Sequence, residues 1–250
     1  MKITEYIDAL ETAGRGLAVA AAEAGPDAEV PTCPGWRVRD LLRHTSMVHR
    51  WATDLVVEAR ATYQPDGGET TLNGEELLAH FREGHAALVA ALRAAPESLE
   101  CWTFLPAPSP LTFWARRQAH ETTVHRADAE SALAAGPGPV EPMVAADGID
   151  ELLRGFHGRD RSKVRTAEPR TLRVRATDTG DVWSVHLSAT EPPRTERGGR
   201  ATGPADAELG GPADRLYLFL WNRLPVGAVT LTGDEEIARL WRETSGIGWS

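Results

Sequence analysis

Residues 109–128 read SPLTFWARRQAHETTVHRAD, and this stretch indicates how the N-terminal half of the chain folds. Ser109 is a typical helix N-cap, and Pro110 suits the first helical turn, where its missing N–H would have had no partner. Steps of three and four residues trace one face of the predicted helix, made of Leu111, Trp114, Gln118, Glu121, His125 and either Asp128 or Ala129. A carboxylate and an imidazole therefore occupy core positions, where an unpaired charge would be strongly destabilising.

Three more segments with helical periodicity precede this one. They cover residues 3–22, 36–61 and 73–95, the last with Asn73 as its N-cap, and the fourth helix is expected to reach residue 135. Four helices of about twenty residues predict an antiparallel bundle, whose interior is the usual place for a metal or cofactor.

The periodicity changes from helical to alternating in the C-terminal part. A short helix over 142–156 and a polar linker over 157–163 come first, and the polar run 192–204 shows no element. The predicted elements are strands 172–176 and 182–187 joined by a turn at 178–180, strand 205–209, helix 212–224, strand 228–231 and helix 234–244. The expected fold class is α+β in two domains: a helical bundle over 1–160 and a small α+β domain over 161–250.

Composition narrows the function. The 250 residues carry 27 basic and 36 acidic side chains, a net charge of −9, so the basic surface of a nucleic-acid-binding protein is missing. No apolar run approaches the ~20 residues that cross a bilayer, and we expect a cytoplasmic protein without a membrane partner. The two cysteines, Cys33 and Cys101, have no CxxC spacing, so histidine and carboxylate groups would have to hold any metal.

Glu121 and His125 are four residues apart and can present an oxygen and a nitrogen to one point inside the bundle. Such pairs are more often surface pairs, but a third ligand would complete a His₂Glu set with an open position, a pattern of catalytic zinc. Either His44 or His49 can supply it, and periodicity does not choose between them. His120 borders the stripe as a competitor.

The other polar and aromatic candidates have structural interpretations. Asp128 either orients a ligand histidine or lies exposed on the helix. The remaining histidines are expected to be surface or structural residues, and four tryptophans to be core residues; these are His80, His85, His157 and His186, and Trp36, Trp51, Trp102 and Trp114.

The motifs over 30–36 (VPTCPGW), 40–44 (DLLRH), 48–51 (VHRW) and 113–130 closely resemble the actinobacterial mycothiol-dependent maleylpyruvate isomerase family. Residues 176–180, 218–223 and 232–234 extend the resemblance over nearly the whole chain. It implies a DinB-like four-helix bundle followed by a small α+β domain of the sterol-carrier-like type.

The resemblance also implies a site. It assigns a divalent metal, usually zinc, to His44, Glu121 and His125, and it selects His44 over His49. It places Arg223, which follows the apolar helix of the C-terminal domain, at the cleft between the domains as a catalytic residue that holds a substrate carboxylate or stabilises an enolate. Residues 45–47 (TSM) depart from the Leu-Gly-Gly that relatives often have, so substrate identity is not transferred.

The expected function is a metal-dependent transferase or isomerase that uses mycothiol and acts on a small electrophile, including one that carries a carboxylate. A metal-bound thiolate is the nucleophile in this interpretation. The alternatives are a hydrolase that uses metal-activated water and a non-catalytic protein that binds a small molecule or thiol adduct. We expect a monomer or weak dimer.

Overall fold

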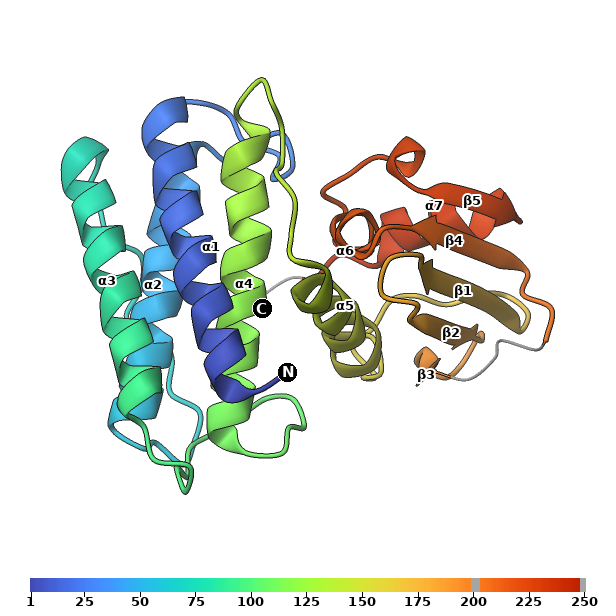
Figure 1. Cartoon of the computed structure of the whole chain (residues 1–250), viewed down its shortest axis with the longest axis horizontal. Coiled ribbons are helices and arrows are strands. Elements are labelled where there is room, and N and C mark those ends of the chain that lie inside the picture. Colours follow the sequence, from blue (N-terminus) through green and yellow to red (C-terminus); the bar gives the residue numbers. More distant parts are fainter. Residues whose placement is uncertain (199–202, 248–250) are drawn as a thin grey trace. The chain divides into compact units, whose positions relative to one another are not determined.

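Four long helices form the first of two units, Met1–Gly138, in the computed structural model, which describes residues 1–198 and 203–247 (Figure 1). The helices are α1 (Ile3–Ala24), α2 (Val38–Val57), α3 (Gly74–Ala94) and α4 (Pro110–Ser131). All four predicted helices are therefore confirmed, with ends that differ by a few residues. Ser109 caps α4 by accepting a hydrogen bond from the backbone N–H of Thr112 at 3.1 Å.

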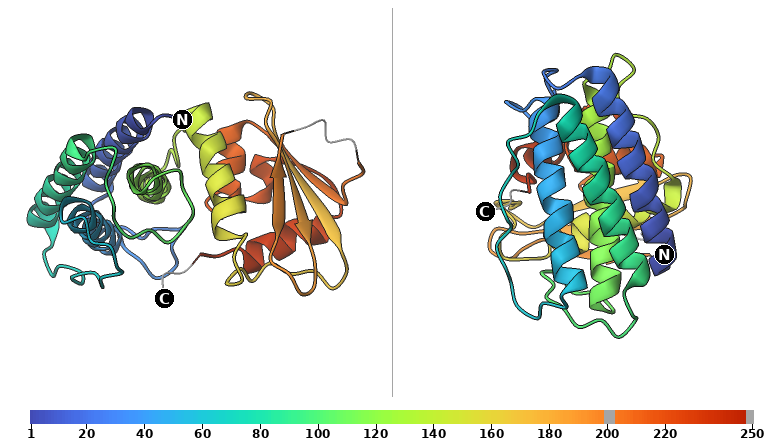
Figure 2. Two further views of the ribbon diagram at one scale, coloured as in Figure 1. Left: turned by 90° about the horizontal axis from the view of Figure 1, so that it is seen from below. Right: turned by 90° about the vertical axis from the view of Figure 1, so that its left-hand side faces the viewer.

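The bundle closes as a ring in which α1 packs on α4 and α3, while α2 packs on α3 and α4 (Figure 2). Helices α2 and α4 run in opposite directions, because Trp36 just before α2 lies against His125 whereas Trp51 lies against Trp114. The inward faces carry a core of leucine, alanine and aromatic side chains, and α4 is buried on nearly all sides. This burial brings the polar residues of α4 into the interior.

The second unit, Pro139–Ser250, combines a sheet with helices on one of its faces (Figure 2). Its elements are α5 (Pro142–Asp150), the π-helical turn η1 (Glu151–Phe156), β1 (Arg170–Ala176), β2 (Val182–Leu187), β3 (Arg194–Arg197), β4 (Ala207–Gly211), α6 (Ala213–Leu220), the 3₁₀ turn η2 (Val226–Ala228), β5 (Thr230–Gly233) and α7 (Glu235–Thr244). The α+β class predicted from the sequence is confirmed.

The sheet order is β3-β2-β1-β4-β5. The predicted hairpin is present, with β1 antiparallel to β2 and Val174 opposite Trp183. Strand β1 also pairs with β4 in parallel, with Val174 beside Leu209. Strands β1 and β4 pack under α6, and the inward apolar side chains of β1, β2 and β4 are buried.

Two features differ from the sequence analysis. Strand β3 lies in the segment 192–204, for which no element was predicted, because an edge strand with mostly exposed polar side chains shows no apolar alternation. The chain divides after Gly138 rather than at residue 160. The reason is that α5 and η1 bury apolar residues such as Ile149 and Leu153 within the second unit, where α5 packs on α6.

Among the described residues, no helix has both the length and the apolar character required to cross a membrane.

Candidate metal centre

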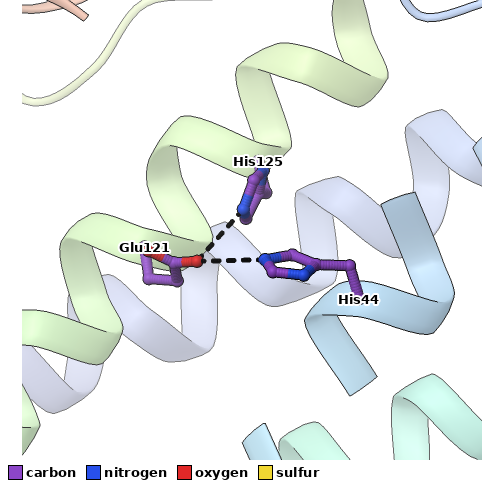
Figure 3. Close-up of side chains that lie close together, drawn as sticks. All are labelled: His44, Glu121 and His125. Atoms are coloured by element: carbon purple, nitrogen blue, oxygen red, sulfur yellow. Dashed lines mark hydrogen bonds and ion pairs between the residues drawn. The ribbon is translucent and has the colours of Figure 1, made fainter. Parts of the chain in front are cut away.

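Three side chains from two helices converge inside the bundle (Figure 3). Helix α2 provides His44, and α4 provides Glu121 and His125, one helical turn apart. One potential ligand atom from each residue lies within 4.8 Å of the other two. The structure therefore brings together the three residues that the family resemblance selected, with His44 rather than His49 facing Glu121.

The spacing fits one small cation. The Oε1 atom of Glu121 lies 3.1 Å from Nε2 of His125 and 3.5 Å from Nε2 of His44. Ligand atoms bound tetrahedrally at about 2.0–2.1 Å, the bond lengths typical of zinc, lie about 3.3 Å from one another. Two nitrogens and one carboxylate oxygen also form the donor set of catalytic zinc sites that keep one position for a water or substrate.

Charge in the site is balanced in the absence of a metal. Burial by itself would raise the pKa of Glu121, but His125, His44 and Arg117 outweigh it and hold that pKa well below the ordinary range. Burial by itself would lower the pKa of His125, whereas Glu121 and Asp128 raise it to about 9. The carboxylate and a proton on His125 thus form a buried ion pair, and a cation between the same atoms would take the place of that proton.

Arg117 forms a hydrogen bond with the second carboxylate oxygen of Glu121. Its guanidinium is almost fully buried and donates to Oε2 of Glu121 at 3.2 Å, one helical turn before it on α4. Because Oε2 is engaged, Oε1 is the oxygen that faces the two histidines. The sequence analysis gave no role to Arg117, although its position four residues before a core glutamate is the signal that could have revealed it.

Asp128 is buried and orients His125, rather than lying exposed. Nδ1 of His125 donates to Oδ2 of Asp128 at 2.9 Å, and the Thr32 hydroxyl donates to Oδ1 at 2.6 Å. With its Nδ1 proton donated in this way, His125 would have an Nε2 lone pair available for a metal. The hydrogen bond from Thr32 connects the loop before α2 to α4. Helical periodicity could not predict this contact, because the two residues lie in separate segments.

Trp36 forms an aromatic wall beside the site. Its ring stacks on His125 at 6.5 Å between centroids and is tilted against His44 at 5.2 Å. The residue is partly buried, so the core position predicted for it is only partly correct; Trp114 alone of the four predicted core tryptophans is fully buried. The placement of Trp36 follows from the turn at Cys33–Trp36, which the sequence marked only as a chain break.

The other two candidate histidines lie outside this group. His49 is fully buried, and its Nε2 pairs with the Thr122 hydroxyl at 2.9 Å. Burial lowers its pKa to about 3, so it is neutral. His120 is also fully buried rather than bordering the stripe, because α1 covers this side of α4 and places Tyr6 edge-on to its ring.

The TSM segment at 45–47 follows His44 within α2. The Thr45 hydroxyl donates to the carbonyl of Leu41 in its own helix at 2.8 Å, and Ser46 is buried. Thr45 and Ser46 thus add polar groups to the buried side of α2 directly after His44.

Arg223 belongs to the second unit, just beyond α6. Asn222 adopts a left-handed backbone conformation (φ 62°) that ends the helix, and the backbone N–H of Arg223 then donates to the carbonyl of Leu218 at 2.7 Å. Its guanidinium donates to the carbonyl of Trp221 at 2.7 Å. The end of α6 therefore fixes the backbone position of Arg223. The catalytic role of Arg223 stays a prediction.

A helical bundle with a buried His₂Glu group, followed by an α+β unit, defines a two-domain protein with a candidate metal centre in its first domain. Residues 7–130 match the family described as the mycothiol maleylpyruvate isomerase N-terminal domain, and residues 143–239 match the C-terminal domain of the same family. The chain belongs to the mycothiol maleylpyruvate isomerase family, which confirms the family predicted from the motifs.

Solved structures show the same fold. The chain is similar to the crystal structure of the mycothiol-dependent maleylpyruvate isomerase, with a TM-score of 0.63, 12% sequence identity and 93% of each chain covered. A histidine-to-alanine mutant of that isomerase matches with the same values. Comparison with curated proteins found no matching sequence.

Proposed function

We propose that this chain is a metal- and mycothiol-dependent transferase or isomerase that acts on a small electrophile. The observation that carries the proposal is the convergence of His44, Glu121 and His125 within 4.8 Å, in a chain that belongs to the mycothiol maleylpyruvate isomerase family. The fold matches that isomerase over 93% of the chain.

The three side chains would hold a divalent metal, with zinc favoured by the nitrogen-rich donor set. Bound there, the metal would lower the pKa of a thiol at its open position, so that the thiol is present as the nucleophilic thiolate at neutral pH. Arg117 donates to Oε2 of Glu121 and leaves Oε1 toward the site, and Asp128 accepts from Nδ1 of His125, so that Nε2 is the nitrogen that a metal would bind. These contacts orient the ligands, and the proton on Nε2 of His125 would leave as the cation binds.

The thiolate sulfur would then form a bond to one carbon of an activated double bond, and the electron pair of that double bond would move toward the group that activates it. Rotation about the new single bond and departure of the thiolate would give the isomer; protonation of the adduct instead would complete a transferase reaction. We propose that Arg223 binds a carboxylate of the substrate, because its planar guanidinium can donate two parallel hydrogen bonds.

The first test is metal content after purification in the presence of zinc. We expect about one zinc per wild-type chain, and its loss in Glu121→Gln, whose amide oxygen is a poor ligand. Glu130→Gln is the matched control on the same helix, because Glu130 pairs with Arg126 away from the site. Wild-type protein without stoichiometric metal would refute the proposal.

The second test is thiol dependence of turnover over a panel of electrophiles and esters. Turnover that requires mycothiol supports the proposed reaction. Ester hydrolysis indifferent to thiol would indicate a metal-water hydrolase, and tight binding without chemical change would indicate a binding protein. Arg223→Met should raise KM for carboxylate substrates and leave the zinc content unchanged.

A further inference from the structure

In each of the two histidines of the metal centre, Nδ1 faces a carboxylate, but the two carboxylates differ in distance and exposure. Asp128 is fully buried and lies 2.9 Å from Nδ1 of His125. Glu69 approaches Nδ1 of His44 with its Oε1 at 3.9 Å, and its side chain remains 45% exposed. His125 is therefore hydrogen-bonded to a buried carboxylate, whereas His44 faces an exposed carboxylate that lies beyond hydrogen-bond distance.

The orientation of His44 gives Glu69 its importance. Nε2 of His44 faces Glu121, so Nδ1 must carry the proton if Nε2 is to bind a metal. Metal-binding histidines almost always donate this second N–H to a carboxylate, a carbonyl or a water. A separation of 3.9 Å is too long for that hydrogen bond, and a movement of about 1 Å would form it.

Glu69 lies in a segment that can make such a movement. The loop 58–73 between α2 and α3 exceeds the ~12–15 residues above which a structureless loop is uncommon. It is anchored on one side by Trp51, whose indole N–H donates to the carbonyl of Gln64 at 2.7 Å. On the other side Arg43 donates to the carbonyl of Leu72 at 3.0 Å.

Between these anchors the chain runs over residues 65–70, which include consecutive glycines just before Glu69. Gly68 has a φ of 78°, a left-handed conformation that glycine adopts freely, and neither glycine has a neighbour that a side chain would meet. Residues 65–69 are exposed. This segment can therefore shift without disturbing the packing of the bundle.

We propose that Glu69 is a positioning residue for His44, and that residues 65–70 close onto His44 when the site takes up metal. The inference rests on the proposed metal centre and adds to it a loop whose order depends on metal occupancy. The closing movement gives His44 the carboxylate partner that Asp128 already gives His125.

The first readout is zinc affinity, measured by competition with a chromophoric chelator. Glu69→Ala is expected to weaken zinc binding by about tenfold or more, as is usual when the partner of a metal-binding histidine is removed. Glu69→Gln should lose less, because its amide oxygen still accepts a hydrogen bond. Glu58→Ala is the matched control: it removes the same charge from the same loop, where Glu58 is 51% exposed and pairs with Arg60.

The second readout is amide hydrogen exchange of residues 65–70 with and without zinc. Exchange should slow on zinc addition in the wild type and in Glu58→Ala, but not in Glu69→Ala. Zinc binding by Glu69→Ala with wild-type affinity, or exchange unaffected by zinc in the wild type, would overturn this inference alone. A wild-type chain that binds no zinc would overturn the proposed function as well.

Discussion

Asp128 accepts a hydrogen bond from Nδ1 of His125 at 2.9 Å on one oxygen and a hydrogen bond from the Thr32 hydroxyl at 2.6 Å on the other. Hydrogen bonds thereby connect the loop before α2, through the buried Asp128, to a histidine of the metal centre. The orientation of His125 consequently depends, through Asp128, on Thr32, which lies 96 positions before Asp128 in the sequence.

Asp128→Ala should weaken zinc binding by about 10- to 100-fold, because His125 loses the acceptor that fixes its tautomer and ring orientation. Asp128→Asn should lose less, and Thr32→Val should have a smaller effect in the same direction. Thr123→Val is the control, since it removes a buried hydroxyl of α4 that bonds only to the carbonyl of Ala119 at 2.7 Å. Equal zinc affinity in the Asp128 variants and the control would show that the contact has no role in metal binding.

Substitutions of His44 and His49, the two candidate ligand histidines of α2, should affect different properties: zinc binding in the first case and the free energy of unfolding in the second. His44→Ala should abolish stoichiometric zinc and should lower the free energy of unfolding of the metal-free protein less than His49→Ala does, because the His44 side chain is partly exposed whereas His49 is fully buried. His49→Ala should retain zinc but lower the free energy of unfolding by about 2–4 kcal/mol, because it leaves a cavity beside Phe81. Metal analysis and urea titration check both, and zinc loss in the His49 variant would contradict the assignment.

Arg117→Met should destabilise the metal-free protein by about 1–3 kcal/mol, since it leaves Oε2 of the buried Glu121 without the hydrogen bond from the guanidinium, while His125 still faces Oε1. A metal between Glu121 and the histidines would neutralise the same carboxylate. Zinc should therefore raise the melting temperature of this variant more than that of the wild type. Arg126→Met, which removes the cation that pairs with Glu130, should show the wild-type zinc response.

The second unit should lose stability in mild acid because of His157. This histidine is buried against Trp241, and burial together with Arg159 lowers its pKa from 6.5 to about 4. The unfolded chain therefore takes up a proton that the folded chain refuses, so the free energy of unfolding falls as the pH decreases from about 6.5 toward 4. The full contribution of this group is about 3 kcal/mol.

His157→Gln should reduce that pH dependence, as measured by denaturant titration at several pH values. His186→Gln, on the partly exposed outer face of β2, should leave it unchanged. The same slope in His157→Gln as in the wild type would show that another group dominates the acid sensitivity of this unit.

Helical spacing predicted much of this protein. Steps of three and four residues placed Glu121 and His125 on the buried face of α4, and the structure confirms it. The same spacing left Asp128 open between a buried and an exposed position, and the structure shows that it is buried. Local signals also predicted the cap at Ser109 and the hairpin of β1 and β2. Strand β3 was missed, because its residues are polar on an exposed edge and its pairing with β2 leaves no local pattern.

What the sequence by itself determined is the four helices of the bundle, the hairpin of β1 and β2 and the apolar faces of these elements, because these depend on the period of a helix or strand and on residues a few positions apart. Periodicity did not choose between His44 and His49, and the family resemblance selected His44. Only the tertiary structure showed that His44 meets Glu121, how β1 pairs in parallel with β4, and that Thr32, Trp36 and Glu69 lie close to the metal-centre histidines. Those relationships depend on how separate elements rotate and dock, and that is set by packing across the whole core.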